Sequence, residues 1–223
     1  MPAKYHYNVE QGSEEWHKLR TGILTASEIK LILTPSLQIA KNDKVRSHVY
    51  EIAAQRANNY TEPHYISDDM LRGKGDEVYA RELYSDKYAP VIECGFVTRE
   101  IGGITYGYSP DGLVGDDGLI EVKSRRQKYQ METICKNEVP DEFMLQIQSG
   151  LLITERKWCD FISYCGGMPM FVKRVYPDVD IQEAIIQAGA NFELSVLEMI
   201  KFYELNSKDL QPTERIIEEE MVL

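Results

Sequence analysis

The chain has 223 residues, of which 43% are hydrophobic and 27% charged, so it suits one soluble globular domain with a sizeable core. Its net charge of −11 argues against a protein that coats nucleic acid through bulk attraction, although a local basic surface would suffice for an enzyme. No apolar run approaches the roughly 20 residues of a membrane span, and the first residues show no apolar signal core. We therefore expect a cytoplasmic protein with no membrane partner.

Helical patterns come first along the chain, over residues 12–33, 41–58 and 67–89. The first region holds two short helices, with Ser13 as the N-cap candidate of one and Thr25 or Ser27 of the other. Gly73 and Gly75 interrupt the third helix and would cost about 1 kcal/mol each in a helix interior. That cost indicates that something approaches the backbone at these glycines.

The pattern then changes to short β-branched segments separated by Gly and Asp, which predict consecutive antiparallel strands over 91–100, 103–111, 111–115 and 118–124. A helix over 140–154, strands over 157–165 and 170–177, and a long helix from Asp178 are predicted to follow. This order predicts an α+β fold with a central sheet flanked by helices. No linker or repeat is evident, so we expect a single domain over 1–223, with a solvated acidic end at about 207–223.

One predicted hairpin carries an unusual set of polar residues. In "GLIEVKS" side chains alternate between faces, so Glu121 and Lys123 share one face of the strand. The turn signal "GDDG" at 115–118, if centred on Asp116, places Asp111 across from Glu121. Directly opposed residues have Cβ atoms roughly 4.5–5.5 Å apart. Asp111, Glu121 and Lys123 are therefore predicted to lie on one patch.

Two carboxylates this close repel each other unless one takes a proton or a cation lies between them. Mg²⁺ prefers such oxygen ligands, and one or two ions could activate a water and stabilise the leaving oxygen of a phosphodiester. Lys123 would then orient or activate that water, or neutralise charge on the phosphate. The residues by themselves leave an alternative open, because apolar-in and charged-out alternation is also typical of any half-exposed hairpin.

Pro110-Asp111, followed by Glu121-Val122-Lys123, resembles the signature of the PD-(D/E)XK nuclease superfamily. Longer segments resemble, in the same order, the phage lambda exonuclease family of alkaline exonucleases from phage and prophage recombination systems. These segments are "EQGSEEWHKLRTGILTASE", "RGKGDEVYAR", "YSPDGLVGDDGLIEVKS" and "FMLQIQSGLL", which span residues 10 to about 154.

The resemblance implies a restriction-endonuclease-like core with a central mixed sheet. It also implies a Mg²⁺-dependent enzyme, with Mn²⁺ as a substitute, that digests the 5′-ended strand of linear double-stranded DNA in the 5′→3′ direction. The 3′ single-stranded overhang would serve recombination by strand annealing. The family further implies a ring-shaped homotrimer, a single-strand annealing protein as partner, and a phage or prophage origin in a bacterial host.

Carried onto this sequence, the family pattern makes Asp111, Glu121 and the Val122 backbone carbonyl the metal ligands. Lys123 would act on the attacking water.

The family pattern adds two residues from predicted helices. Glu77 would complete the acidic shell, although Arg81 lies four residues on and could form an ordinary helical ion pair with it. Gln146 would sit beside the site, although it lies off the apolar stripe of its helix and could equally be an exposed glutamine. Related nucleases often carry a tyrosine four residues after such a glutamine, but here that position is Gly150.

The resemblance also implies a 5′-phosphate site formed by Arg20, Ser27 and Ser109. A guanidinium offers phosphate a planar fork of donors. Ser27 could equally be a simple N-cap, and Arg20 a surface arginine. Arg125 and Arg126 continue the strand that would hold the scissile phosphate and are predicted DNA contacts.

Two other functions remain open from the sequence. One is an endonuclease of the same superfamily that cleaves at a particular site or junction. The other is a non-catalytic scaffold that binds DNA ends and whose hairpin is only a surface feature.

Overall fold

The structure is a computed structural model, and it describes residues 1–62 and 67–215. The predicted acidic end is therefore seen only over 207–215, where the chain is mostly exposed, and the remainder lies outside the described residues. Among the described residues, no helix is both long enough and apolar enough to cross a membrane.

The helices are α1 (Glu14–Arg20), α2 (Ile29–Ile32), α3 (Asp43–Asn58), α4 (Asp68–Lys87), α5 (Gln127–Lys136), α6 (Asp141–Thr154) and α7 (Val179–Asn206), with a 3-10 turn η1 at Ala26–Glu28. The strands are β1 (Lys4–His6), β2 (Leu24–Thr25), β3 (Val91–Ile92), β4 (Phe96–Ile101), β5 (Ile104–Tyr108), β6 (Gly112–Val114), β7 (Gly118–Ser124), β8 (Trp158–Tyr164) and β9 (Phe171–Val175). Ser13 caps α1 as predicted, whereas the cap residue of η1 is Thr25 and not Ser27.

The strands form two mixed sheets, with the orders β1-β4-β5-β2 and β3-β6-β7-β8-β9. The prediction of consecutive antiparallel pairing was wrong at one point, because β5 and β6 do not pair. The chain leaves the first sheet after Tyr108 and enters the second at Gly112. Pro110, which lacks a backbone N–H, lies in this crossing. The α+β class and the mixed pairing are confirmed, since β2–β5 and β7–β8 are parallel pairs.

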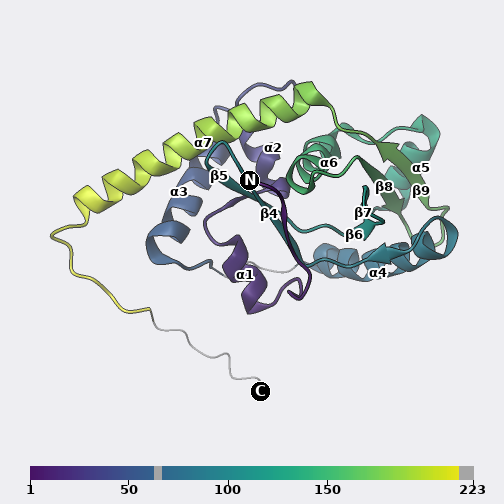
Figure 1. Cartoon of the computed structure of the whole chain (residues 1–223), viewed down its shortest axis with the longest axis horizontal. Coiled ribbons are helices and arrows are strands. Elements are labelled where there is room, and N and C mark those ends of the chain that lie inside the picture. Colours follow the sequence, from purple (N-terminus) through teal and green to yellow (C-terminus); the bar gives the residue numbers. More distant parts are fainter. Residues whose placement is uncertain (63–66, 216–223) are drawn as a thin grey trace, which may run out of the picture.

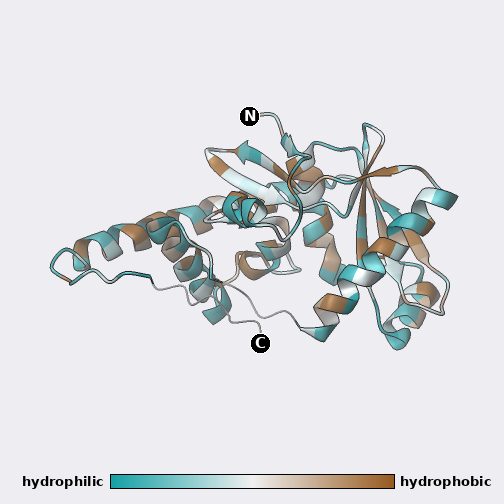
Figure 2. Cartoon of the chain, turned by 90° about the horizontal axis from the view of Figure 1, so that it is seen from below, coloured by the Kyte–Doolittle hydropathy of each residue, from teal (hydrophilic) through white to brown (hydrophobic). Residues whose placement is uncertain are grey.

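Helices cover both faces of the five-stranded sheet (Figure 1). On one face, α4 contributes Ala80 and Tyr84 to a small core with Ile120 of β7. On the other face, α6 packs into the main core, which extends to α3 and to the buried stripe of the long helix α7. Hydrophobic residues, brown in Figure 2, gather in the strands of the five-stranded sheet, and its central strands β7 and β8 are mostly buried because helices cover both of their faces.

The β6–β7 hairpin has the predicted register. Val114 pairs with Gly118 and Gly112 with Ile120, so the next position places Asp111 opposite Glu121. At the turn, the buried guanidinium of Arg156 donates to the carbonyls of Gly115 and Gly118, at 2.8 and 2.7 Å. This clamp satisfies turn carbonyls that would otherwise lack donors, and it fixes the register that brings the two acids together.

Candidate active site

Three side chains of the β6–β7 hairpin lie together where β7 extends past the start of β6 and is still paired with β8. The Lys123 Nζ donates to Glu121 Oε1 at 2.6 Å, and Asp111 Oδ2 accepts from the backbone N–H of Val122 at 2.6 Å. Lys123 also lies over the ring of Phe143 of α6, with Nζ 5.6 Å from the centroid. The alternative of a merely exposed hairpin is not supported, because the Glu121 side chain is only 1% exposed.

Two further donors hold the Glu121 carboxylate. The Gln146 side chain of α6 donates to Oε1 at 2.6 Å, and the Tyr108 hydroxyl at the end of β5 donates to Oε2 at 2.7 Å. Gln146 therefore turns toward the site and is not an exposed helix glutamine. Four residues on, Gly150 packs against the Tyr108 ring. The tyrosine that related nucleases often carry four residues after the glutamine is thus replaced here by Gly150, and Tyr108 of the strand β5 lies in its place.

Glu77 reaches the same region from α4 on the edge of the site. Arg81 forms the expected ion pair with Glu77 at 3.4 Å, and it also pairs with Glu93 at 3.3 Å. Its Nη1 donates to the backbone carbonyl of Asp111 at 3.0 Å. The ion pair and the proximity to the acids therefore coexist, and Arg81 ties α4 to the crossing between the sheets.

The acids of this cluster are electrostatically unsatisfied. Burial, and then the charges of Glu121 and Glu77, raise the pKa of Asp111 well above its usual range. Burial also raises the pKa of Glu77, and the neighbouring charge of Glu121 adds to that shift while Arg81 opposes it. Burial by itself lowers the pKa of Lys123, but Glu121 and Asp111 outweigh it, so the pKa lies above its ordinary value. Lys123 is therefore an ammonium group among an excess of carboxylates.

The donor set at this position fits a hard divalent cation. Among the described residues, no three His, Cys, Asp or Glu side chains lie close enough to form a complete metal centre by themselves. Mg²⁺ needs no such cage, because it is commonly held by one or two carboxylates and keeps several waters. Asp111 and Glu121 meet that requirement, and a bound cation would offset both the burial and the repulsion by neighbouring acids that raise the pKa of Asp111.

Two of the three predicted phosphate-binding residues, Ser27 and Ser109, lie at one end of the four-stranded sheet. Because β2 and β5 run parallel, with Thr25 opposite Gly107, the residues that follow both strands lie at the same end of the sheet. Ser27 follows β2 and Ser109 follows β5. The indole Nε1 of Trp16 donates to Ser109 Oγ at 2.9 Å.

Arg20 joins this group through Trp16, since its Cζ lies 4.2 Å from the centroid of that ring. Burial lowers the pKa of Arg20, an effect that Glu28 partly opposes. Within residues 1–62 and 67–215, no salt bridge or hydrogen bond of its guanidinium is found. Arg20 is therefore a partly buried cation whose donors remain available, unlike the simple surface arginine that was the alternative interpretation of the sequence.

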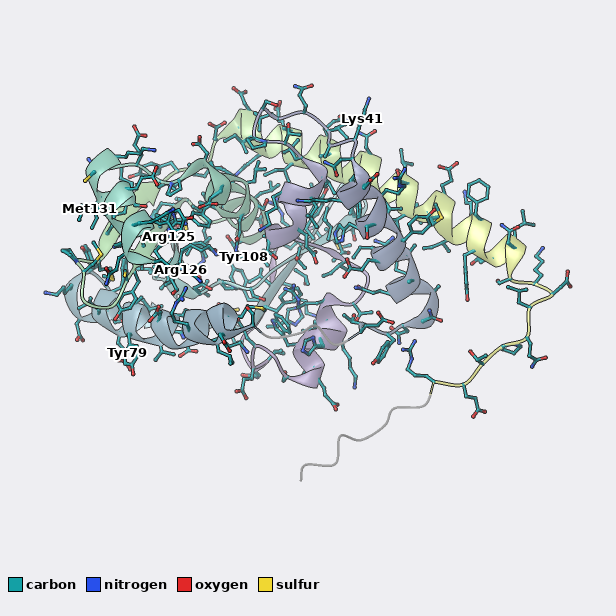
Figure 3. The ribbon with its side chains drawn as sticks, turned by 180° about the vertical axis from the view of Figure 1, so that it is seen from behind. Lys41, Tyr79, Tyr108, Arg125, Arg126 and Met131 are labelled. Atoms are coloured by element: carbon teal, nitrogen blue, oxygen red, sulfur yellow. The ribbon has the colours of Figure 1, made fainter. Side chains whose placement is uncertain are left out.

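Arg125 and Arg126 follow β7, and Figure 3 shows them close to each other at the start of α5. The Arg125 guanidinium pairs with Glu142 at 2.8 Å and lies 5.0 Å from the Phe143 centroid, with only 11% of its side chain exposed. Arg125 therefore has a packing role, whereas Arg126 is exposed. Their contact with DNA stays a prediction.

A family model described as a YqaJ-like viral recombinase domain matches residues 15–157. The chain belongs to this family. No curated protein matches the sequence. The predicted relation to the lambda exonuclease family is thereby confirmed, and the match covers the candidate site from Arg20 to Gln146.

Solved structures resemble this YqaJ-like protein over most of its length. An alkaline exonuclease, LHK-Exo from Laribacter hongkongensis, shares 30% identity with a TM-score of 0.77, covering 89% of this chain and 100% of that chain. LHK-Exo in complex with dAMP matches with 29% identity, a TM-score of 0.75 and the same coverage. A phage related exonuclease from Haemophilus somnus 129PT, at 13% identity and a TM-score of 0.61 over 84% of this chain and 99% of that chain, shares the fold alone. The predicted restriction-endonuclease-like core is confirmed.

Sequence reasoning missed two residues of the site. Tyr108 reads as an ordinary apolar strand residue, and its acceptor lies on another strand. Arg81 was recognised only as the partner of Glu77, since no local signal reveals its bond to the Asp111 carbonyl. The "YSPD" motif, whose first residue is Tyr108, was the only available hint of its role.

Proposed function

We propose that the protein is a divalent-metal-dependent exonuclease. It digests the 5′-ended strand of linear double-stranded DNA in the 5′→3′ direction and leaves a 3′ overhang for recombination by strand annealing. One observation carries the proposal: in a member of a viral recombinase family, Asp111, Glu121 and Lys123 converge with Gln146 at one end of the sheet. The similarity to LHK-Exo supports a nuclease role.

The roles of the residues follow from their contacts. Asp111 and Glu121, with the Val122 carbonyl, would hold Mg²⁺ or Mn²⁺, and the bound cation would stabilise phosphodiester charge and lower the pKa of an attacking water. Lys123 keeps its proton, so it would orient the water or offset charge on the phosphate. Gln146 orients the Glu121 carboxylate from α6.

Glu77 would add negative charge at the edge of the site. Its ion pair with Arg81 places that charge, and the bond from Arg81 to the Asp111 carbonyl holds the chain crossing in place.

The 5′ specificity would come from the group formed by Arg20, Ser27 and Ser109. A partly buried guanidinium with available donors binds phosphate more strongly than a fully solvated one, because less water competes for it. Trp16 supports both Arg20 and Ser109, so it would shape this site without touching the reacting atoms.

Assembly and partners belong to the same proposal. A homotrimeric ring would enclose the duplex, and a single-strand annealing protein would take up the 3′ overhang. The exposed Arg126 would face the DNA backbone at the mouth of the site.

Digestion of three substrates tests the function. Linear duplex with 5′-phosphate, linear duplex with 5′-hydroxyl and closed circular duplex are incubated with Mg²⁺ or with EDTA. We expect Mg²⁺-dependent loss of the 5′-ended strand, fastest from the phosphorylated end, and no cutting of the circle. Lys123→Ala and Glu121→Ala should each lower the rate at least about 100-fold. Lys157→Ala is the matched control, because Lys157 pairs with Asp117 at the far end of the same hairpin.

The alternatives predict other outcomes. Efficient cutting of the circle would identify an endonuclease. Binding of linear ends without hydrolysis would identify a scaffold. If folded Lys123→Ala and Glu121→Ala proteins digest linear duplex as fast as the parent, the hairpin is not the catalytic site.

A further inference from the structure

Two tyrosines of β5 lie in nearly identical surroundings. Tyr106 and Tyr108 are two residues apart on a strand, so their side chains share a face, and they are 0% and 2% exposed. Each ring packs against a glycine of a helix. A Cβ atom at Gly150 of α6 would lie 2.8 Å from Tyr108 Cζ, and one at Gly189 of α7 would lie 1.9 Å from the Tyr106 hydroxyl oxygen. Even alanine at either helix position would displace the ring.

The two hydroxyl groups differ in what they bind. The Tyr108 hydroxyl donates to Glu121 Oε2 at 2.7 Å, in the interior of the molecule as Figure 3 shows for Tyr108. The Tyr106 hydroxyl is buried and has no hydrogen-bond partner among the residues that the structure describes. One strand therefore carries a tyrosine that contacts the candidate metal ligand and a matched tyrosine that does not.

The Glu121 carboxylate is held differently at its two oxygens. Oε1 accepts from Lys123 of the same strand and from Gln146 of α6, both at 2.6 Å, whereas Tyr108 is the only donor to Oε2 among the residues that the structure describes. A carboxylate oxygen has about two acceptor directions, so Oε2 keeps one for a cation. Donors on both oxygens, from separate elements, prevent the carboxylate from rotating.

We propose that Tyr108 is a positioning residue for metal binding, and that Gly150 is required because it admits the Tyr108 ring. This inference rests on the proposed metal-dependent hydrolysis. Through its hydroxyl, Tyr108 fixes the rotation of the Glu121 carboxylate and so keeps the remaining acceptor direction of Oε2 in one place for a cation. Partners that orient a metal ligand without touching the metal commonly affect metal affinity or activity by 10- to 100-fold, which sets the scale of the expected effect at roughly that range.

The experiment compares Tyr108→Phe with Tyr106→Phe in the full chain. Mn²⁺ binding is measured without DNA by the electron paramagnetic resonance signal of free Mn²⁺, and kcat and KM are measured on 5′-phosphorylated linear duplex. We expect Tyr108→Phe to weaken Mn²⁺ binding and lower kcat by about 10- to 100-fold while the KM for DNA stays within about twofold. Tyr106→Phe removes a hydroxyl that has no acceptor, so both quantities should match the parent.

Gly150→Ala tests the second half of the inference, with Gly189→Ala as its control. Gly150→Ala should weaken Mn²⁺ binding in the parent and add no further loss in a Tyr108→Phe background, because the hydroxyl bond to Glu121 that the ring displacement would break is then already absent. Gly189→Ala should lower the melting temperature through Tyr106 and leave the Mn²⁺ affinity of the folded protein unchanged.

The possible results separate the two proposals. A Tyr108→Phe protein with the parent's Mn²⁺ affinity and kcat would overturn the positioning role and leave the exonuclease function standing. Equal losses in the two tyrosine variants would also overturn it, since they would reflect general core damage. A parent protein that neither binds Mn²⁺ nor hydrolyses DNA would overturn both.

Discussion

Two buried carboxylates lie on the neighbouring parallel strands β7 and β8 and face opposite sides of one sheet. Glu121 faces α6 and is 1% exposed, and Asp160 faces α4 and is 4% exposed. Each accepts a short hydrogen bond from a buried tyrosine, Tyr108 at 2.7 Å for Glu121 and Tyr84 at 2.6 Å for Asp160. The fold thus uses the same tyrosine–carboxylate contact twice.

The two carboxylates differ in charge balance. Asp160 is bound by the Arg174 fork, with Nε at 2.7 Å and Nη2 at 2.8 Å, so one acid meets one cation. Among the described residues, Glu121 and Asp111 have only Lys123 as a cation between them, and Glu77 with its partner Arg81 lies nearby, so this cluster has an excess of negative charge. A compensated buried pair has a structural role, whereas uncompensated acids indicate a place that needs a ligand.

The largest effect is expected for Asp111→Asn. Asparagine can still accept the Val122 N–H but carries no charge for a cation, so the rate of Mg²⁺-dependent digestion should fall by at least about 1,000-fold, or about 4 kcal/mol of transition-state stabilisation. At pH 8 in EDTA the same change should raise the melting temperature, because it removes one of the mutually repelling carboxylates. Activity and stability would then change in opposite directions.

The pH dependence of stability gives a control for this explanation. Burial and the neighbouring acids raise the pKa of Asp111 in the folded protein, so between its unfolded and folded pKa values the folded state binds a proton that the unfolded chain has lost. The metal-free parent should therefore lose stability as pH rises through that window. Chemical unfolding in EDTA at a series of pH values should show a flatter profile for Asp111→Asn. If the pH profile of the unfolding free energy is the same in Asp111→Asn as in the parent, Asp111 is not the acid whose pKa is raised by folding.

A smaller effect is expected for Asp160→Asn, which should lower stability and leave activity unchanged, the reverse of Asp111→Asn. It removes a hydrogen-bonded charge but leaves Arg174, whose side chain is 43% exposed and can be solvated. The free energy of unfolding should fall by about 2 kcal/mol, below the 3–5 kcal/mol typical when the remaining partner is fully buried. Digestion per folded molecule should stay within about twofold of the parent. A selective loss of activity in a stable variant would show that the α4 face also serves the reaction.

The hairpin could be predicted because its information is local. Alternation with a period of two residues and the "GDDG" turn determine which residues oppose each other, and the structure has that register from Gly112–Ile120 to Val114–Gly118. The long final helix was predictable for the same reason, since its apolar stripe recurs at helical spacing and its cap residue is Asp178.

Other features depend on contacts between distant segments, which no local pattern encodes. The division into two sheets takes place within "SPD", a motif that reads as an ordinary turn. Arg125 continues the active strand, yet its charge is satisfied by Glu142, seventeen residues away. Gln146 lies off the apolar stripe of α6, and its partner Glu121 belongs to a strand. Hydrophobic periodicity predicts which face of a helix or strand packs against the apolar core, but it does not predict which buried polar side chains bind each other.

The smallest effect is expected where the two regions meet, on the first half of α4. Its second half covers the Asp160 face, whereas Arg72 of its first half donates to Ser124 at the end of β7, at 3.2 Å. Gly73 and Gly75 lie there, and a Cβ at either would meet nothing within 4 Å. Alanine at each should therefore raise the free energy of unfolding by about 0.5–1 kcal/mol, measured by chemical denaturation.

The same two variants, Gly73→Ala and Gly75→Ala, test whether the first half of α4 only covers the sheet or also contacts DNA. If this surface is only a cover for the sheet, both variants should bind and digest linear duplex as the parent does. If the duplex backbone approaches the glycines, the added methyl groups should weaken DNA binding severalfold while Mn²⁺ binding without DNA is unchanged. Such a separation of the two affinities would place the DNA path across α4, between the uncompensated acids and the balanced pair.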